Sequence, residues 1–402
     1  MKITAVEKRL LDCIQKNLFL LFAVVMSVLA VVVRIGLFDF TSRDYNIYLL
    51  PWYEKIRSLS GREALATAVG NYNIPYQTMI WILTLLPIKP LYAYKIISCI
   101  CDFIMAAASG KLVFGLSAHL EYDKRMAAGI AAYCSLLFLP TVIMNSAQWA
   151  QCDAIFSAFI LLALLFLYED RFRAAFIMLG IAFAFKLQAV FILPFFLYRW
   201  AADRRFSLLN FLWLPAVQYI LSIPAFLCGR SLADPITIYA DQAGVYPYMY
   251  LNFQSFWVLV CPDDSYKILS GPAEMLTVVL LGCGLFRLLR IPSKQASSPT
   301  LFLPTAAWTA WTCVMFLPSM HERYGYLPEA LLVISCCLQP ALIPAAAAAV
   351  CCSLLHYGYY LFSYDISDEL FFIASAVYFA AYVWFTVRLV QTSADRKSET
   401  SS

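Results

Sequence analysis

Asp44 has the chemistry of a general base. It lies in the polar and aromatic stretch RDYNIYLLPWYEKI, which follows the first apolar run of the chain. A carboxylate at the boundary between water and lipid can take the proton of a hydroxyl nucleophile. Tyr48, Trp52 and Tyr53 recur at helical spacing, which predicts a helix lying in the membrane interface. The plainer alternative is a solvated loop aspartate paired with Arg43, and this stretch taken alone favours that alternative.

Polar side chains also interrupt two later apolar runs. Gln151 and Asp153 occur in NSAQWAQCDA, at or just inside the expected membrane boundary, where ionisable groups usually face a cavity or a partner. They could equally form a polar cap on a helix pair. Lys186, with Gln188 after it, follows the uncharged run GIAFAF and could bind a phosphate as a point charge. It could also extend to the lipid headgroups.

A third polar cluster, PSMHERYGY, places an imidazole, a carboxylate and a guanidinium at three consecutive positions. These residues are His321, Glu322 and Arg323. On a helix the side chains of His321 and Arg323 would diverge by about 200°, whereas in a loop they could face one ligand. A guanidinium suits a phosphate because it can bind two oxygens at once. A local salt bridge between Glu322 and Arg323 is the alternative.

The remaining candidates for chemistry are weaker. Asp102 and Lys95 lie deeper, on one expected span, where the carboxylate could pair with a lysine or join an internal polar network. The chain contains no HExxH, GxSxG, P-loop or GxGxxG motif and no paired-cysteine metal spacing. Zinc hydrolase, serine hydrolase and nucleotide-binding sites therefore lack their motifs, and the sequence supports neither a cofactor nor a metal site.

A strongly apolar composition determines the elements that must position these residues. Of the 402 residues, 62% are hydrophobic and 13% are charged, against about 45–50% and about 25% in soluble domains. The excess extends along the whole chain, which predicts an all-α, polytopic transmembrane bundle. The 29 basic and 25 acidic residues give a net charge of +4, which excludes a nucleic-acid binder built on a broad basic surface. Cysteines such as Cys336 and Cys352 stand in apolar runs, where thiols act as small hydrophobes rather than as a disulfide framework.

Twelve apolar segments recur along the chain. They cover residues 18–38, 92–113, 127–143, 154–168, 174–185, 189–198, 207–227, 272–289, 300–317, 326–338, 341–356 and 370–388. Several are shorter than the ~20 residues of a perpendicular span, so some could be broken or paired half-helices. Basic clusters between the segments favour about twelve crossings with both termini in the cytoplasm. Thr78–Leu86 would then dip into the outer leaflet and return, and the alternative in which it crosses would put Lys124 and Arg125 outside.

This topology predicts one transmembrane domain over residues 1–391 and a short polar cytoplasmic tail over 392–402, the only part in which the composition does not exclude disorder. It brings the loops 39–91 and 229–269 to the outer side, together with residues 145–153, 318–326 and the turn at 186–188. These loops would form the active face. The aromatic residues of the second loop could form an interfacial belt or stack on sugar rings, and the composition does not decide between the two.

The order of the polar segments resembles the GT-C superfamily of polytopic glycosyltransferases, and in particular bacterial mannosyltransferase-like proteins related to the second GPI mannosyltransferase. The matching pieces are RDYNIYLLPWYEKI with GNYNIPY, then PIKPLYAYKIISCICDF, NSAQWAQCDAIFSAFILL, GIAFAFKLQAVFILPFFL and MHERYGYLP. They cover most of residues 39–200 and the stretch around 320. QCDAIF and FKLQAVFILP are the most specific of them.

The resemblance implies a membrane glycosyltransferase in the plasma membrane. It would move a hexose from a polyprenyl-phosphate donor to a glycan or lipid acceptor at the outer face, usually with inversion. The acidic base that the family carries in its first outer loop corresponds to Asp44. The superfamily often has two adjacent acids at this place, whereas this chain has Arg43 beside Asp44 and Asp39 five residues back.

A mechanism that fits the layout of the polar segments gives roles to the other polar residues. The leaving phosphate would be stabilised by cationic groups: Lys186, Arg323, His321 and Lys95. Acceptor and sugar hydroxyls would be positioned by Arg43, Gln151, Asp153, Gln188 and Glu322.

Two other functions could use the same groups. A transporter or flippase for lipid-linked sugars would use them as a substrate path, but transporters tend to have inverted repeats and midplane charges, and no repeat is visible here. A polysaccharide polymerase also acts outside, on lipid-linked oligosaccharides. The sequence leaves the sugar and the acceptor open.

Overall fold

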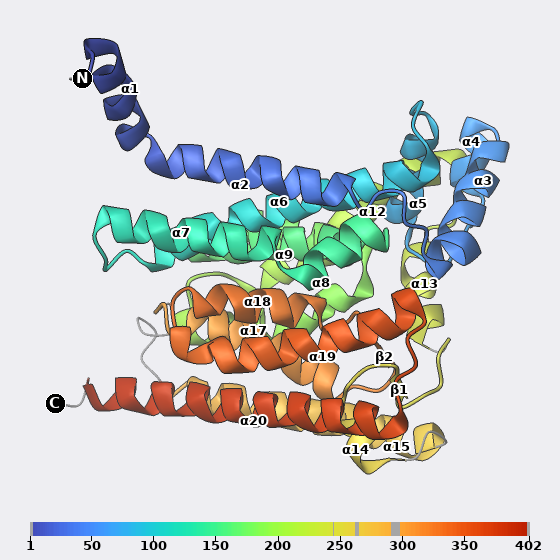
Figure 1. Ribbon diagram of the computed structural model, residues 1–402. Helices are drawn as coiled ribbons and strands as arrows, with labels where there is room; N and C mark the ends of the chain where they lie inside the picture. The colour runs from blue at the N-terminus through green and yellow to red at the C-terminus, as the bar shows by residue number, and fades with distance from the viewer. Residues whose placement is uncertain (1–2, 244, 262–264, 291–297, 400–402) are drawn as a thin grey trace.

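The computed structural model describes residues 3–243, 245–261, 265–290 and 298–399. Within them the chain is almost entirely helical, which confirms the predicted all-α class. The only strands in these residues are β1 (Tyr250–Leu251) and β2 (Met320–His321), which pair in parallel. Most of the helices run side by side along one direction and form a single bundle (Figure 1).

Six helices in the described residues are long and apolar enough to cross a membrane. They are α2 (Leu18–Ile35), α6 (Pro90–Leu116), η4 with α12 (Leu208–Cys228), α15 (Tyr266–Leu288), η6 with α19 (Pro340–Phe362) and Asp368–Ala394 of α20. A pair bent by 47°, Tyr122–Leu137 with Pro140–Gln148, makes a possible seventh span. The chain is therefore a helical protein with several candidate membrane spans, and the predicted count of twelve is not confirmed.

The two ends of the bundle differ. Helix α1 (Ala5–Lys16) and the last turns of α20 lie at one end (Figure 1). The opposite end carries short elements: η1 (Tyr45–Leu49), α3 (Leu50–Ser58), α4 (Gly61–Ala66), α5 (Ile74–Thr84), α13 (Asp234–Ala243), α14 (Phe256–Val260) and the two strands. Polar segments that are far apart in the sequence thus meet at one end of the molecule.

Two apolar runs are broken, as their lengths predicted. Helix α10 (Phe172–Phe185) ends because Lys186 adopts an extended conformation, with φ −151° and ψ 132°. A 3₁₀ segment (Leu187–Ile192) and α11 (Leu193–Asp203) then continue the chain. Likewise α7 (Tyr122–Leu137), α8 (Pro140–Ile143) and the π turn η2 (Met144–Gln148) precede a break at Ala150, whose φ is 65°. Helix α9 (Asp153–Tyr168) begins after it, so both breaks place polar residues inside the protein.

The remaining helices are α17 (Phe302–Phe316) and α18 (Tyr326–Cys336). The helix predicted around Tyr48 and Trp52 is confirmed by η1 and α3. The second loop, 229–269, is not an open loop, because its described residues include α13, β1, α14 and the first turn of α15; residues 244 and 262–264 lie outside the described residues. The segment expected to dip and return is the single short helix α5 with the turn after it.

Two expectations at the level of side chains and chain ends can also be compared with the structure. Helix α20 (Asp368–Glu399) continues past Thr392 into the polar tail, the one part in which the composition did not exclude disorder; residues 400–402 lie outside the described residues. The continuation is an extension of an apolar helix whose polar last turns still make backbone hydrogen bonds. All thirteen cysteines are free thiols, so the expectation that they form no disulfide framework is confirmed.

Close helix packing depends on glycine where α6 meets α7. A Cβ atom at Gly129 would lie 2.8 Å from the carbonyl oxygen of Gly110, and one at Gly110 would lie 2.9 Å from that of Gly129. Small residues allow membrane helices to approach until their backbones touch. This contact holds α6 against α7. Since α6 is one continuous helix, it also helps to position Pro90, where the helix begins, near the polar end of the bundle.

Candidate active site

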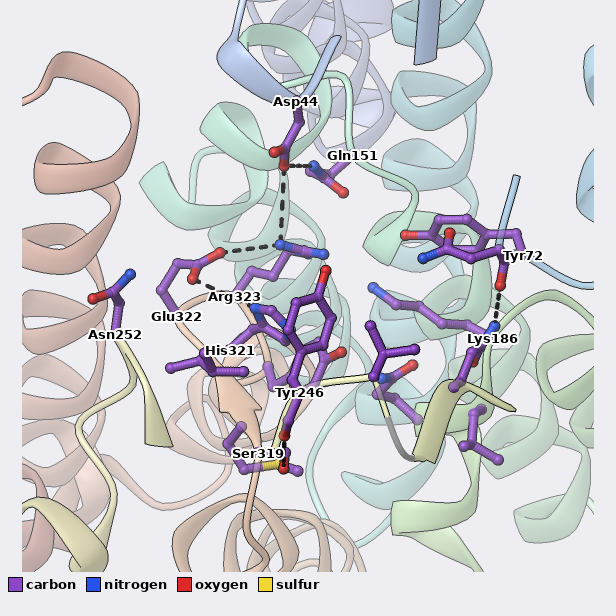
Figure 2. A pocket seen from close by; sticks show the side chains of 18 of the residues that line it. Asp44, Tyr72, Gln151, Lys186, Tyr246, Asn252, Ser319, His321, Glu322 and Arg323 are labelled. Atoms are coloured by element: carbon purple, nitrogen blue, oxygen red, sulfur yellow. Dashed lines mark hydrogen bonds and ion pairs between the residues drawn. The ribbon is translucent and has the colours of Figure 1, made fainter. Parts of the chain in front are cut away.

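A cavity of about 630 Å³ opens at the polar end of the bundle. Its wall combines the first loop, the break after η2, the break at Lys186, Gln242, residues 245–252 and residues 317–324 (Figure 2). Tyr360 of α19 also lines it. Eight of the ten predicted site residues line it, which are Arg43, Asp44, Gln151, Lys186, Gln188, His321, Glu322 and Arg323. The fold therefore brings together residues separated by nearly three hundred positions in the sequence.

Asp44 is buried, with 6% of its surface exposed. Its Oδ2 atom accepts hydrogen bonds from Trp149 Nε1 at 3.0 Å and from Gln151 Nε2 at 2.6 Å, and its Oδ1 atom accepts one from the Tyr360 hydroxyl. A carboxylate has about four lone-pair positions, and no second donor among the described residues reaches Oδ1, so these residues leave one of its positions open. The solvated aspartate paired with Arg43 is wrong, because neutral donors hold Asp44 while Arg43 is exposed.

Arg323 lies at the centre of the charged cluster and points toward Asp44 and Glu322 (Figure 2). Its Nη1 atom is 3.0 Å from Glu322 Oε1 and 4.0 Å from Asp44 Oδ2, and its Nε atom is 3.7 Å from Asp153 Oδ2. The local pair with Glu322 is therefore formed, and the same guanidinium also faces residues from two distant segments. The tight turn after β2 makes this possible, since it frees His321 and Arg323 from the divergence that a helix would impose.

Lys186 and Asp153 form a buried ion pair next to Arg323. Their side chains are 5% and 1% exposed. Asp153 also accepts a hydrogen bond from Asn145 Nδ2 at 2.9 Å. Asp153 does not line the cavity but lies behind Lys186 and holds its ammonium in place.

The environment of His321 and Glu322 changes how readily each is ionised. Burial lowers the pKa of His321 well below its usual value, and the nearby cations Arg323 and Lys186 lower it further. Burial raises the pKa of Glu322, although Arg323 opposes the rise. At neutral pH His321 is thus an uncharged imidazole, whose ring packs edge-on against Tyr246 with 4.8 Å between centroids.

Lys95 does not join this site, which corrects its assignment to phosphate binding. Its Nζ atom donates hydrogen bonds to the carbonyl oxygens of Leu37 at 3.0 Å, Phe38 at 2.9 Å and Phe40 at 2.7 Å. These carbonyls belong to the turn that follows the end of α2 at Ile35. All three protons of the ammonium are used there, so Lys95 holds the backbone of this turn.

Asp102 pairs with an arginine rather than a lysine. Arg34 Nε lies 2.9 Å from Asp102 Oδ2, and the Ser146 hydroxyl donates to the same oxygen at 2.5 Å. Arg34 also donates to the carbonyl oxygen of Leu137 at 3.0 Å. The result is an internal polar network that ties α2 to α6 and to the segments around α8, as one of the two expectations proposed.

Several site residues were not predicted. Tyr360 is 316 positions from Asp44 in the sequence, and no local pattern around it indicates that its hydroxyl reaches the carboxylate. Trp149 and Asn145 stand in the polar segment NSAQWAQCDA, which was singled out for its glutamines and aspartate. Trp149 and Asn145 could have been predicted from this segment, because polar residues alternate there with a tryptophan between two apolar runs.

Among the described residues, no group of three or more His, Cys, Asp or Glu side chains is placed to hold a metal ion. A comparison of the chain with models of protein families gives no match. A comparison with curated proteins gives no match either.

Proposed function

We propose that this protein is a GT-C-type membrane glycosyltransferase, which moves a hexose from a polyprenyl-phosphate donor to a hydroxyl of a glycan or lipid acceptor. The observation that carries the proposal is the buried carboxylate of Asp44, which keeps an open lone pair and faces Arg323 at 4.0 Å across a cavity that Lys186 also lines. A base and a cationic phosphate site must line the same cavity, on opposite sides of the anomeric carbon, because one substrate bond forms while the other breaks.

The membrane topology of the proposal is about twelve crossings in a bacterial plasma membrane, with both termini in the cytoplasm. It requires the shorter helices α9, α10, α17, α18 and the 3₁₀ segment with α11 to cross as well. Support comes from the ends of the bundle, since α1 and the last turns of α20 lie at the end opposite to η1, α3, α13 and the strands (Figure 1), whose residues line the cavity. The basic clusters favour the cytoplasmic side of the membrane for the end that carries α1 and the last turns of α20. The cavity would then open at the outer headgroup level, where the phosphate of a lipid-anchored donor lies.

In the proposed reaction the acceptor hydroxyl attacks the anomeric carbon of the hexose. Asp44 takes the hydroxyl proton as the new carbon–oxygen bond forms. The bond between the anomeric carbon and the phosphate oxygen breaks on the opposite side, and polyprenyl phosphate leaves with the electron pair. Attack from the face opposite to the leaving group inverts the anomeric centre.

Lys186 and Arg323 would stabilise the charge that develops on the leaving phosphate. Both already have carboxylate partners, Asp153 and Glu322, so an anionic donor must compete with these partners. Burial raises the pKa of Glu322, so this carboxyl gains a proton, and releases the Arg323 guanidinium, more readily than an exposed glutamate would. His321 adds an uncharged imidazole that can donate a hydrogen bond to an oxygen.

The decisive experiment is turnover of a synthetic polyprenyl-phosphate hexose by the purified full-length protein in liposomes. Asp44→Asn should lower kcat by a factor of about 10²–10⁴, the usual contribution of a general base. Asp39→Asn is the matched control: it neutralises an exposed acid of the same loop, whose carboxylate accepts a hydrogen bond from Tyr92 at 2.5 Å, and should leave turnover unchanged.

Near-wild-type transfer by Asp44→Asn would contradict the proposal. A flippase would move the donor between leaflets without releasing polyprenyl phosphate, and a polymerase would accept only lipid-linked oligosaccharides. Following polyprenyl phosphate release and donor translocation in the same liposomes separates these three activities.

A further inference from the structure

Aromatic side chains form a continuous ladder along one wall of the cavity. We define the aromatic ladder as Tyr76, Tyr72, Trp52 and Tyr48. Ring centroids are 4.5 Å apart between Tyr76 and Tyr72, 5.8 Å between Tyr72 and Trp52, and 5.9 Å between Trp52 and Tyr48. The last three of these residues line the cavity. The ladder therefore joins α5 to α3 through side chains that face an open space.

The ladder leads outward from the charged cluster. Tyr76 is 2% exposed and Tyr48 is 42% exposed, with Tyr72 and Trp52 half-buried between them. Near its inner end Tyr72 lines the same cavity as Arg323 and Lys186. A ligand lying along the ladder would thus have one end beside the proposed reaction centre and the other at the surface.

Trp52 is fixed in orientation by Gly70. This glycine has a φ of +77°, and a Cβ atom there would lie 2.8 Å from Cε2 of the Trp52 indole. The indole thus packs directly on the backbone at a position that only glycine fills without strain. Gly70 thus covers one side of the Trp52 indole. The Tyr72 ring packs edge-on against the indole, with an angle of 70° between the two ring planes. The aromatic surface is prepared before any ligand arrives.

Polar groups flank the ladder where it reaches the surface. Gln242 of α13 donates a hydrogen bond to the carbonyl oxygen of Asn71, and both residues line the cavity. Arg43 is exposed nearby in the first loop and lines it as well. Amide and guanidinium groups around a flat apolar surface match a sugar ring, which has apolar C–H faces and a rim of hydroxyls.

We infer that the aromatic ladder is the binding site for sugar rings of the acceptor, so that the acceptor of this protein is a carbohydrate. This inference rests on the proposed function, and it narrows the acceptor to a free glycan end or the sugar headgroup of a glycolipid. The sugar beside Tyr72 would present its hydroxyl to Asp44, and the following sugars would lie on Trp52 and Tyr48.

The test measures sugar binding separately from transfer. Full-length protein in nanodiscs is mixed with neutral trisaccharides of gluco, manno and galacto configuration and with decyl glycosides of the same sugars, and saturation-transfer NMR is recorded. At least one probe should receive saturation at its ring protons. Trp52→Ala should weaken its binding about tenfold or more, the effect of losing an aromatic anchor, and Trp52→Tyr should restore most of it.

Trp384→Ala removes a half-buried indole of α20 that does not line the cavity, and should bind as the wild type does. Binding of a trisaccharide identifies a free glycan end, and binding of a decyl glycoside alone identifies a glycolipid headgroup. Absence of binding by every probe, or equal binding by Trp52→Ala and the wild type, overturns the inference. Sugar binding without any transfer by the wild type would overturn the proposed function and leave the sugar site in place.

Discussion

Removing the ammonium of Lys186 tests whether its ion pair with Asp153 holds the site together. In Lys186→Met the carboxylate of Asp153, 1% exposed, loses its nearest cation. Breaking a buried pair at one partner costs about 3–5 kcal/mol, because a buried charge is left uncompensated. Asp153 keeps the Asn145 amide at 2.9 Å and Arg323 Nε at 3.7 Å, so we expect a loss near the lower end of that range.

The double variant Lys186→Met/Asp153→Leu should recover part of this loss, because apolar residues of similar volume often replace a buried ion pair without cost. The loss that remains, about 1–3 kcal/mol, comes from the Asn145 amide, which no longer has an acceptor. Asp153→Leu alone leaves the buried charge of Lys186 without its partner and should cost about 3–5 kcal/mol. A thermodynamic cycle of the three variants should therefore give a favourable coupling energy of about 3 kcal/mol or more for the two wild-type side chains.

The assay is reversible unfolding of the full-length protein in mixed micelles, followed by tryptophan fluorescence. Lys124→Met is the control, because its pair with Glu121 is 67% and 81% exposed and should be worth little. Additive losses in the cycle would refute the structural role. If the double variant regained stability together with normal donor turnover, Lys186 would have no part in phosphate binding.

Two further outcomes follow from the fold and the site. Burial holds the folded-state pKa of His321 well below the usual 6.5. The unfolded chain therefore binds one more proton, and the free energy of unfolding should fall as the pH drops below about 6.5. His321→Gln should flatten this pH dependence in unfolding titrations, and an unchanged titration would exclude His321 as its cause. Gly129→Ala forces a Cβ atom to within 2.8 Å of the Gly110 carbonyl oxygen and should destabilise the protein by about 1–3 kcal/mol, whereas Gly271→Ala in α15, with no atom within 4 Å, should not; equal unfolding midpoints for the two variants would contradict the close contact of α6 and α7.

The local chemistry of the site could be predicted from the sequence because each polar group stands out against an apolar run. Gln151, Lys186 and Arg323 were recognisable in this way, and each lines the cavity. Lys95 also stands out as a charged residue in an apolar run, but it does not line the cavity. It is there because the carbonyl groups of the turn after α2 need a hydrogen-bond donor in an apolar setting. Sequence alone cannot distinguish a lysine that binds a ligand from one that binds the backbone.

Long-range partners could not be predicted. The contact between Tyr360 and Asp44 depends on how α19 packs against the first loop, and the pairing of Arg34 with Asp102 depends on the relative depth of α2 and α6. Span counts were uncertain for a related reason. A buried helix may be shorter than the bilayer is thick, so apolar length alone does not determine whether α9 or α18 crosses.

The hydrogen bonds that Lys95 donates to the turn after α2 restrict the length of the first loop. Because its ammonium holds the carbonyl oxygen of Phe40 at 2.7 Å, only three residues separate a fixed backbone point from Asp44. A single residue inserted between them would shift the carboxylate by up to ~3.6 Å along the chain, away from Gln151 and Tyr360. Insertions at 39–44 should therefore abolish the hydrogen bonds of Asp44 with Gln151 and Tyr360. A longer connection between α3 and α4, which lies outside this interval, should leave them intact.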